Sequence, residues 1–84
     1  MFHVVESIIP LTEFRLFVLF RDGTRKIYDV SNLFDKYEMF LPLRDVPALF
    51  EQVRRDPGGH GISWNDEIDI SSEELWDNGT LYKS

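Results

Sequence analysis

The chain has 84 residues, 43% of them hydrophobic and none of them cysteine, which predicts one domain over residues 1–84 and excludes disulfide frameworks and thiolate metal sites. Its longest apolar run is only Leu16 to Phe20, so we expect no signal peptide and no membrane span, and a cytoplasmic location. The formal charge of −6 arises entirely from residues 56–84, since residues 1–55 hold eight acidic and eight basic side chains, and this acidity disfavours direct binding of nucleic acid.

Three strands are predicted in the first part of the chain. Residues 2–9 are rich in β-branched side chains, and Pro10 ends that strand. Residues 14–21 are apolar on one parity and partly apolar on the other, through Phe17 and Leu19, as in a strand with a second covered face. Asp22-Gly23 predicts a two-residue type I′ turn, which returns the chain into a strand over residues 24–30, nearer a sheet edge.

The middle of the chain is predicted to be helical. Residues 31–35 suggest one capped turn of helix, and residues 36–43 an ordered connection that covers the core. Asp45 is expected to cap a longer helix that ends before Asp56-Pro57. This helix would place one apolar stripe against the core, formed by Val46, Leu49, Phe50 and Val53.

The pattern of residues 61–70 predicts two short strands that lead into a third helix. Ser71 and Glu74 have the spacing of a capping box, and Ile70 and Leu75 occupy the hydrophobic-staple positions around it. The predicted fold class is therefore α+β, with a small antiparallel sheet in the order β-β-β-α-α-β-β-α. The first and last helices are short, and the central amphipathic helix packs on the sheet.

The order of these elements and their residues resembles the bacterial domain-of-unknown-function family 2442 (DUF2442). The resemblance covers roughly residues 3 to 76. It is carried by Val4-Val5, Pro10-Leu11, Leu16-x-Val18-x-Phe20-x-Asp22-Gly23, Asp29-Val30, Leu33-Phe34, Phe40, Pro42-Leu43-Arg44-Asp45, Phe50, Val53, Ile62-x-Trp64, Asp69-Ile70 and Leu75.

The resemblance implies a small α+β fold without assigned catalytic residues. It also implies a habit of lying next to, or fused with, other small modules, some of them helix-turn-helix domains, and here we expect such a partner to be a separate protein. One feature departs from the family pattern: Asn65-Asp66-Glu67 stands where proline, asparagine and glycine commonly follow the tryptophan. This predicts a differently built and more acidic turn.

Few side chains in this sequence suggest chemistry. His3 lies in a predicted strand and His60 between glycines, so each is better explained as a lone exposed histidine than as a metal ligand. Asp66, Glu67 and Asp69 are crowded but lack the alternating oxygen ligands and central glycine of an EF-hand loop. The serines have no histidine base near them in sequence. We therefore predict no catalytic, cofactor-binding or metal-binding residue, and no cofactor.

The sequence favours a non-enzymatic protein-interaction module, antitoxin-like or regulatory. Its partner would be another small protein, of basic charge, or a second copy of the chain. The aromatic content of 14%, the second apolar parity of residues 14–21 and the acid-only stretch 56–82 support this interpretation. The candidate interface residues are Phe17, Leu19, Asp66, Glu67 and Trp76.

Two alternatives remain open at this point. The first is an enzyme that uses Asp66, Glu67 or Asp69 as an acid, a base or a metal ligand. The second is a DNA-binding regulator, for which Arg25-Lys26 and Arg54-Arg55 are the only basic pairs. Trp64 is expected in the core. Trp76 fits a core position and an interface anchor about equally well.

Overall fold

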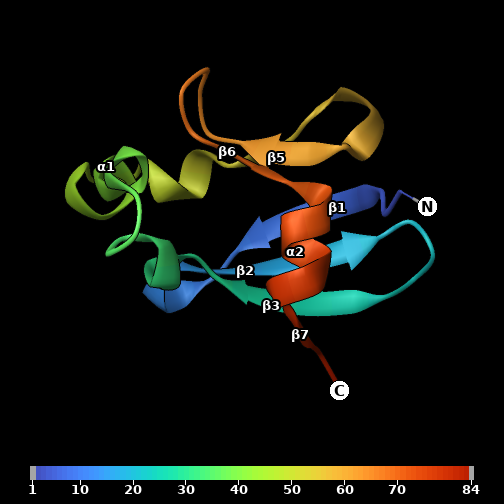
Figure 1. Ribbon diagram of the computed structural model, residues 1–84. Coiled ribbons are helices and arrows are strands. Elements are labelled where there is room, and N and C mark those ends of the chain that lie inside the picture. The colour runs from blue at the N-terminus through green and yellow to red at the C-terminus, as the bar shows by residue number, and fades with distance from the viewer. Residues whose placement is uncertain (1, 84) are drawn as a thin grey trace.

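A four-stranded antiparallel sheet forms the larger layer of the computed structural model, which describes residues 2–83. Its strands lie in the order β1-β2-β3-β7 (Figure 1). They are β1 (Val5–Pro10), β2 (Arg15–Phe20), β3 (Arg25–Asp29) and β7 (Thr80–Leu81). The three strands predicted in the first part of the chain are thereby confirmed. The two-residue β7 pairs with the edge of β3 that does not pair with β2.

A second, three-stranded antiparallel sheet carries the later strands in the order β4-β5-β6. They are β4 (Arg54–Arg55), β5 (Gly61–Ser63) and β6 (Asp69–Ser71). Two α-helices, α1 (Leu41–Asp45) and α2 (Ser72–Asn78), complete the regular elements together with short 3₁₀ turns. These turns are η1 (Thr12–Phe14), η2 (Val30–Leu33), η3 (Glu38–Phe40), η4 (Phe50–Gln52) and η5 (Pro57–Gly59). The predicted α+β class is confirmed.

The hairpin between β2 and β3 has one residue more than predicted. The Phe20 amide donates to the Thr24 carbonyl at 2.8 Å, so the loop comprises residues 21–23 and is not a two-residue turn. The Gly23 amide donates to the Phe20 carbonyl at 2.9 Å, and Gly23 has φ 93°. This is the three-residue pattern in which a type I turn is followed by a glycine with positive φ. The hairpin is confirmed, and its predicted length is wrong.

The helix predicted after Asp45 does not form. α1 ends at Asp45, Val46 adopts extended geometry with ψ 115°, and Ala48 has φ 66°. Pro47 supplies the physical reason, because the residue before a proline is driven out of the α region. Arg54–Arg55, expected at the end of that helix, form β4 instead, paired with Ile62 and Ser63.

The predicted apolar stripe nevertheless reaches the core in large part. Phe50 is buried, and Leu49 and Val53 pack against the core from irregular backbone, while Val46 is 48% exposed. The prediction of which side chains face the core is therefore largely correct, although the predicted helical conformation is wrong. Side-chain burial here depends on the chain passing over the core and not on a period of 3.6 residues.

The helix that packs on the four-stranded sheet is α2, which lies across β1, β2 and β3 in Figure 1. Ser71 caps it as predicted, since its Oγ accepts a hydrogen bond from the Glu74 amide at 3.1 Å. The Glu74 carboxylate, however, turns away from the cap and accepts hydrogen bonds from Tyr28 and Asn78. Only the Ser71 half of the capping box is formed.

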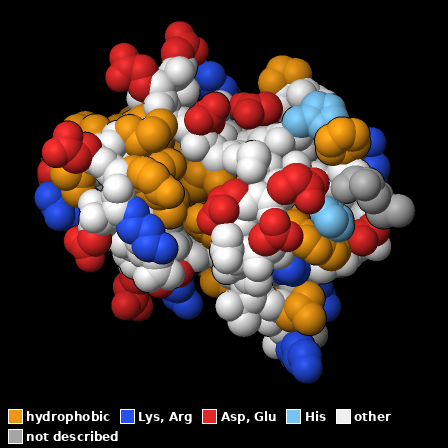
Figure 2. Space-filling view, in the orientation of Figure 1, with side chains coloured by type: hydrophobic (Ala, Val, Ile, Leu, Met, Phe, Trp, Pro, Cys, Tyr) orange, Lys and Arg blue, Asp and Glu red, His pale blue; other side chains and the backbone are white. Residues whose placement is uncertain are grey.

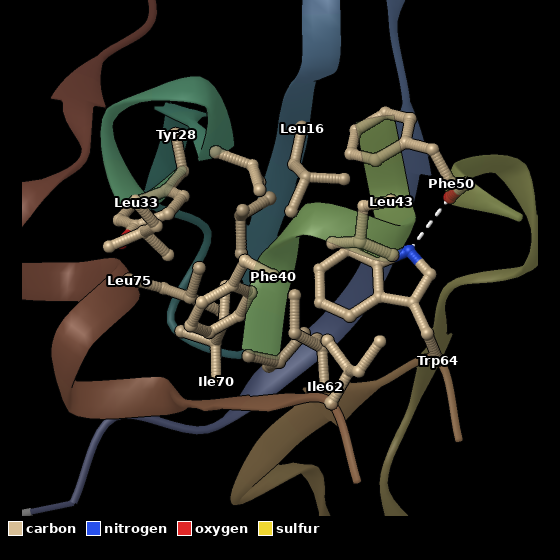
Figure 3. Packing of buried hydrophobic residues seen from close by; sticks show 14 of the residues in the cluster. Leu16, Tyr28, Leu33, Phe40, Leu43, Phe50, Ile62, Trp64, Ile70 and Leu75 are labelled. Atoms are coloured by element: carbon tan, nitrogen blue, oxygen red, sulfur yellow. Dashed lines mark hydrogen bonds between the residues drawn. The ribbon is translucent and has the colours of Figure 1, made fainter. Parts of the chain in front are cut away.

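One hydrophobic core lies between the inner face of the four-stranded sheet and the three-stranded sheet, closed by α1 and α2 (Figure 3). Trp64 is 3% exposed, and its indole Nε1 donates to the Phe50 carbonyl at 2.8 Å, which confirms it as a core residue. The remaining buried members are Val5, Leu16, Val18, Phe20, Tyr28, Val30, Leu33, Phe40, Leu43, Phe50, Ile62, Ile68, Ile70 and Leu75.

Candidate functional site

The face of the four-stranded sheet that points away from the core carries a row of apolar side chains. Side chains alternate along a strand, so Leu16, Val18 and Phe20 of β2 enter the core while the residues between them point outward. We call this side the outer face. Its apolar members are Ile9, Phe17, Leu19, Ile27 and Tyr82.

Strand register brings these side chains together. Phe17 lies directly opposite Ile9 on β1 and opposite Ile27 on β3, so the three form one cross-strand row. The Tyr82 amide donates to the Arg25 carbonyl at 2.9 Å, which extends the pairing of β3 beyond β7. The Tyr82 ring then meets the Phe17 ring edge to face, with the ring centroids 5.5 Å apart.

The outer face is only partly shielded from solvent. Ile9 is 50% exposed and Tyr82 41% exposed, while Phe17, Leu19 and Ile27 are half-buried. α2 and the three-stranded sheet both pack on the opposite, core-facing side (Figure 1). Within residues 2–83, no helix or strand lies over the outer face, so a contiguous apolar surface remains open to a partner.

Three charged side chains border this apolar surface. Arg15 on β2 lies directly opposite Asp29 on β3, next to the row on one side. Arg25 on β3 lies next to the row on the other side, with its guanidinium 5.6 Å from the Tyr82 ring centroid. Arg15 donates to the Thr12 carbonyl at 3.2 Å, and Asp29 accepts from the Ser31 amide at 3.0 Å. Among the described residues, neither Arg15 nor Asp29 forms an ion pair.

The acidic turn lies elsewhere. Asp66 and Glu67 are exposed in the turn between β5 and β6, where the Asn65 side-chain oxygen accepts from the amides of Glu67 at 2.8 Å and Ile68 at 3.0 Å. This turn belongs to the three-stranded sheet, across the core from the outer face. The structure therefore brings Phe17 and Leu19 together but does not add Asp66 and Glu67 to them.

Figure 2 views the molecule from the side of α2, where acidic side chains gather over the helix and the β5–β6 turn. They come from the last third of the chain, in which the sequence places all of the net negative charge. The members of this acidic side are Asp66, Glu67, Asp69, Glu73, Glu74 and Asp77. The outer face, with two arginines and one aspartate, thus differs in charge from the opposite side of the protein.

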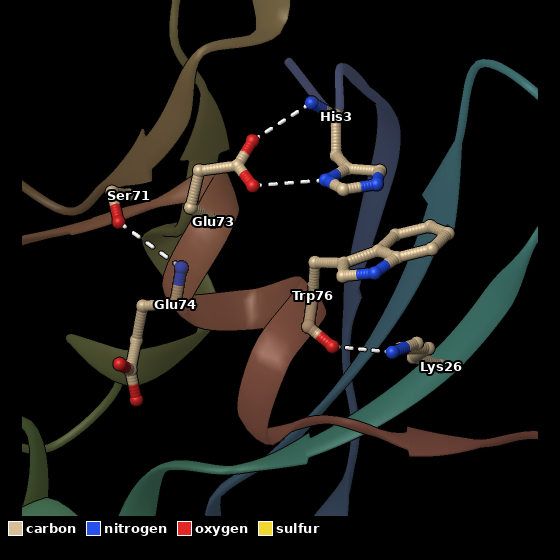
Figure 4. A network of polar contacts seen from close by, with 6 residues as sticks. All are labelled: His3, Lys26, Ser71, Glu73, Glu74 and Trp76. Atoms are coloured by element: carbon tan, nitrogen blue, oxygen red, sulfur yellow. Dashed lines mark hydrogen bonds and ion pairs between the residues drawn. The ribbon is translucent and has the colours of Figure 1, made fainter. Parts of the chain in front are cut away.

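Trp76 also lies on the α2 side and is half-buried by contacts within the chain (Figure 4). Its ring stacks on His3 with the centroids 3.7 Å apart and meets Phe20 edge to face at 4.9 Å. The Lys26 ammonium lies 4.4 Å from the ring centroid and donates to the Trp76 carbonyl. Because Phe20 points into the core and Phe17 points outward, Trp76 and Phe17 lie on opposite faces of the sheet.

His3 is held in place, contrary to its expected role as a lone exposed side chain. Its ring Nδ1 lies 2.9 Å from one Glu73 carboxylate oxygen, and its amide donates to the other oxygen at 2.8 Å. These two contacts lower the pKa of Glu73, the backbone hydrogen bond being the larger cause. The partners are 70 residues apart in sequence, and no local pattern signals their contact.

Two adjoining hollows of about 410 Å³ each lie beside α2 and share Leu33, Lys36, Glu74 and Asn78 in their linings. The carboxylate at their junction is already engaged: Glu74 accepts from the Tyr28 hydroxyl at 2.8 Å and from the Asn78 amide nitrogen at 3.0 Å. Burial, followed by this hydrogen bond, raises the pKa of Tyr28. The hollows are therefore lined by the neutral phenol of Tyr28 and by a Glu74 carboxylate that already accepts two hydrogen bonds.

The histidine and carboxylate side chains are dispersed. Across residues 2–83, no group of three or more His, Cys, Asp or Glu side chains is arranged to hold a metal ion. His60, the second histidine, is exposed and stands near Phe2, with the ring centroids 6.3 Å apart. Of the acidic turn residues, Asp69 lines one of these two hollows, and Asp66 and Glu67 line neither of them.

A family model described as "Protein of unknown function (DUF2442)" matches residues 5–80 of the chain. The matched range includes β1 through β6 and both α-helices. Searches of curated proteins and of solved structures returned no significant match. No helix among the described residues has the length and apolar character needed to cross a membrane.

Proposed function

The chain belongs to the DUF2442 family, whose function is unknown, and we propose that it is a non-enzymatic protein-interaction module that binds its partner on the outer face. In this proposal the partner is another small protein or a second copy of the chain, in a regulatory or antitoxin-like pair. The observation that supports it most strongly is the uncovered cross-strand row formed by Ile9, Phe17 and Ile27.

The outer face has the composition expected of an interface. An aromatic side chain, Phe17, lies at its centre, and apolar neighbours surround it on both adjacent strands. The charged residues that β2 and β3 contribute to this face, Arg15, Arg25 and Asp29, lie in the neighbouring rows on either side of it. An apolar centre with a polar rim is the usual anatomy of a protein–protein contact, and aromatic anchors near its centre contribute most of the binding energy.

The enzyme alternative draws less support from the geometry. It relied on Asp66, Glu67 or Asp69, but the first two are exposed turn residues outside the hollows. Catalytic carboxylates are normally found in concave sites with convergent polar groups, where their pKa values are perturbed. The candidate residues are not gathered in such a site.

The DNA-binding alternative is weakened by the placement of the basic pairs. Arg25 points to the outer face and Lys26 to Trp76, so this pair is split between two sides of the sheet. In the second pair, Arg55 donates from Nε to the Val5 carbonyl at 2.8 Å. A DNA-binding surface usually needs several cations on one face, and these pairs do not provide it.

The location of the binding surface also bears on the charge of the partner. The expectation of a basic partner depended on the acid-only stretch 56–82, and its Asp66 and Glu67 lie across the core from Phe17. A partner seated on the outer face would meet Arg15, Arg25 and Asp29 instead. Its own charges must therefore complement a surface of mixed sign.

Affinity capture with matched variants tests the proposal. We expect the wild-type chain to retain a binding partner and Phe17→Glu to lose it while remaining folded. Met39→Glu is the control, because Met39 is 45% exposed outside the outer face and the variant adds the same charge. If both variants lose the partner, general charge repulsion explains the loss. If neither does, the outer face is not the binding surface.

A further inference from the structure

We propose that the occupant of the outer face is a second copy of the chain, in a twofold-symmetric dimer whose two four-stranded sheets pack face to face. The inference rests on the proposed function in that it assigns a partner to the same surface. The symmetry axis runs parallel to the strands, between β2 and β3, because only there does the pattern of the face complement itself.

The side chains of the outer face form three rows across the strands. The first row contains Leu19 and Arg25, the second Phe17 and Ile27, and the third Arg15 and Asp29. In each row the first residue belongs to β2 and the second to the directly opposite position of β3. A twofold axis along the strands keeps each row at its own level and places β2 of one copy over β3 of the other.

In this arrangement the third row pairs opposite charges twice. Arg15 of one copy faces Asp29 of the second copy, and the symmetry repeats the pair on the other side of the axis. Neither side chain forms an ion pair within residues 2–83, so both charges are available for a partner. Pairing across the axis would fix the register of the two sheets, because a shifted dimer would lose both ion pairs.

The other two rows match by apolar contact. In the second row Phe17 of one copy faces Ile27 of the other, which buries the aromatic side chain at the centre of the face. In the first row Leu19 faces the aliphatic stem of Arg25, whose charged end can remain in solvent. Face-to-face sheets pack about 10 Å apart and nearly aligned, a separation that such side chains fill.

Overall charge does not oppose this contact at the interface itself. The net charge of −6 lies in the last third of the chain, and its exposed acids stand on the α2 side and in the β5–β6 turn. The outer face contributes two arginines and one aspartate, so two such faces approach without facing acidic clusters. A face of four short strands gives an interface at the low end of the usual size range, and we therefore expect a weak dimer.

Charge exchange between two variants tests the pairing. Arg15→Asp leaves two aspartates in the third row, and Asp29→Arg leaves two arginines, so each variant alone should be monomeric in sedimentation velocity. An equimolar mixture should restore the dimer, because the aspartate introduced at position 15 then faces the arginine introduced at position 29, while the unaltered Asp29 and Arg15 face each other. We expect each single variant to weaken self-association at least about tenfold, and the mixture to regain it.

The substitution of Asp29 also removes the hydrogen bond to the Ser31 amide, so folding must be followed by circular dichroism. Asp29→Asn is the matched control, because its amide oxygen can still accept that bond while the charge is lost. It should weaken the dimer less than Asp29→Arg does. Mixed with Arg15→Asp it should associate less strongly than Asp29→Arg does, because only its Arg15 then faces an opposite charge, the Asp29 of Arg15→Asp. If the mixture of the two charged variants stays monomeric although both are folded, the Arg15–Asp29 pairing is wrong.

A cross-linking experiment provides a second measurement that does not depend on charge. The chain has no cysteine, so Phe17→Cys and Ile27→Cys each introduce a single thiol. Sheets about 10 Å apart are too far apart for a direct disulfide, so the thiols are joined with a bis-maleimide of about that span. Cross-linking of an equimolar mixture should favour the heterodimer, in which the thiol at position 17 of one variant is joined to the thiol at position 27 of the other. Predominant cross-links between two copies of the same variant would contradict the proposed axis.

The two proposals fail in different ways. A wild-type chain that remains monomeric up to about 1 mM overturns the dimer. If Phe17→Glu then still abolishes capture of a heterologous partner, the interaction function stands without self-association. If Phe17→Glu changes neither the oligomeric state nor the capture, both proposals are contradicted.

Discussion

Phe17 on β2 and Tyr82 beyond β7 meet edge to face, with their ring centroids 5.5 Å apart, on the side of the sheet that points away from the core. The contact joins the second strand of the sheet to the last part of the chain across β3. Because it fixes two aromatic rings before any partner arrives, less side-chain freedom is lost on binding. A preformed apolar surface is thus built into the fold.

Removing the Phe50 ring should be strongly destabilising. Phe50 is 3% exposed and packs between Phe14 and Trp64, so Phe50→Ala should lower the free energy of unfolding by about 3–5 kcal/mol through loss of burial and creation of a cavity. Urea denaturation measures the change. Val46→Ala, at a 48% exposed position, is the control and should change stability by no more than about 0.5 kcal/mol. Equal effects would contradict the observed core.

The cap of α2 can be tested separately. The Ser71 Oγ accepts the Glu74 amide at 3.1 Å, so Ser71→Ala should cost about 1 kcal/mol of stability. Ser71→Asp retains an acceptor at this position and should recover most of that loss. Chemical denaturation that shows no difference between the wild type and Ser71→Ala would show that this cap does not stabilise the protein.

The contact between His3 and Glu73 predicts a pH dependence. Hydrogen bonds from the His3 amide and ring lower the pKa of Glu73 below its ordinary value of 4.5. A lowered pKa in the folded state means that the stability contributed by Glu73 is present above pH 4.5 and is lost as the pH falls through the folded-state pKa.

We therefore expect Glu73→Gln to be less stable than the wild type at pH 7, and the difference to shrink as the pH falls toward about 2–3. Urea midpoints at several pH values measure it. Glu67→Gln, in the exposed β5–β6 turn, makes the same change of charge and serves as the control. A Glu73→Gln difference that stays constant from neutral to acidic pH would show that the carboxylate contributes nothing through this contact.

Substitutions in the acidic turn test the enzyme alternative. Asp66→Asn and Glu67→Gln should leave folding almost unchanged, because exposed carboxylates interact weakly with their surroundings. Calorimetric titration of the wild type with calcium, magnesium, manganese and zinc should show no site of micromolar affinity. A stoichiometric heat of binding that disappears in Asp66→Asn would revive a metal-dependent function.

Most of the strands and the cap of α2 could be predicted because their signals are local. Alternating apolar residues mark β2, a glycine marks the hairpin, and Ser71 stands three residues before Glu74. The helix predicted after Asp45 is wrong for an equally local reason: the apolar spacing favours a helix, but Pro47 drives Val46 out of the α region. The hairpin length depends on which backbone groups pair, which Asp22-Gly23 alone does not determine.

The candidate surface could be predicted only in part. The second parity of β2 pointed to Phe17 and Leu19, but Ile27 and Tyr82 join them only through strand register. The sequence grouped Asp66, Glu67 and Trp76 with Phe17, whereas the fold places the turn across the core and Trp76 on the α2 side. Proximity between residues distant in sequence depends on tertiary packing, and the single sequence carries no signal of it.

The most direct test of the outer face as a protein-binding surface is fluorescence-detected sedimentation velocity of the labelled chain in a cell lysate, which registers self-association and heterologous complexes alike. The wild type and Met39→Glu should sediment as complexes, and a folded Phe17→Glu should sediment as a monomer. If Phe17→Glu sediments in the same complexes as the wild type, or unfolds because Phe17 belongs to the core, the outer face is not the binding surface.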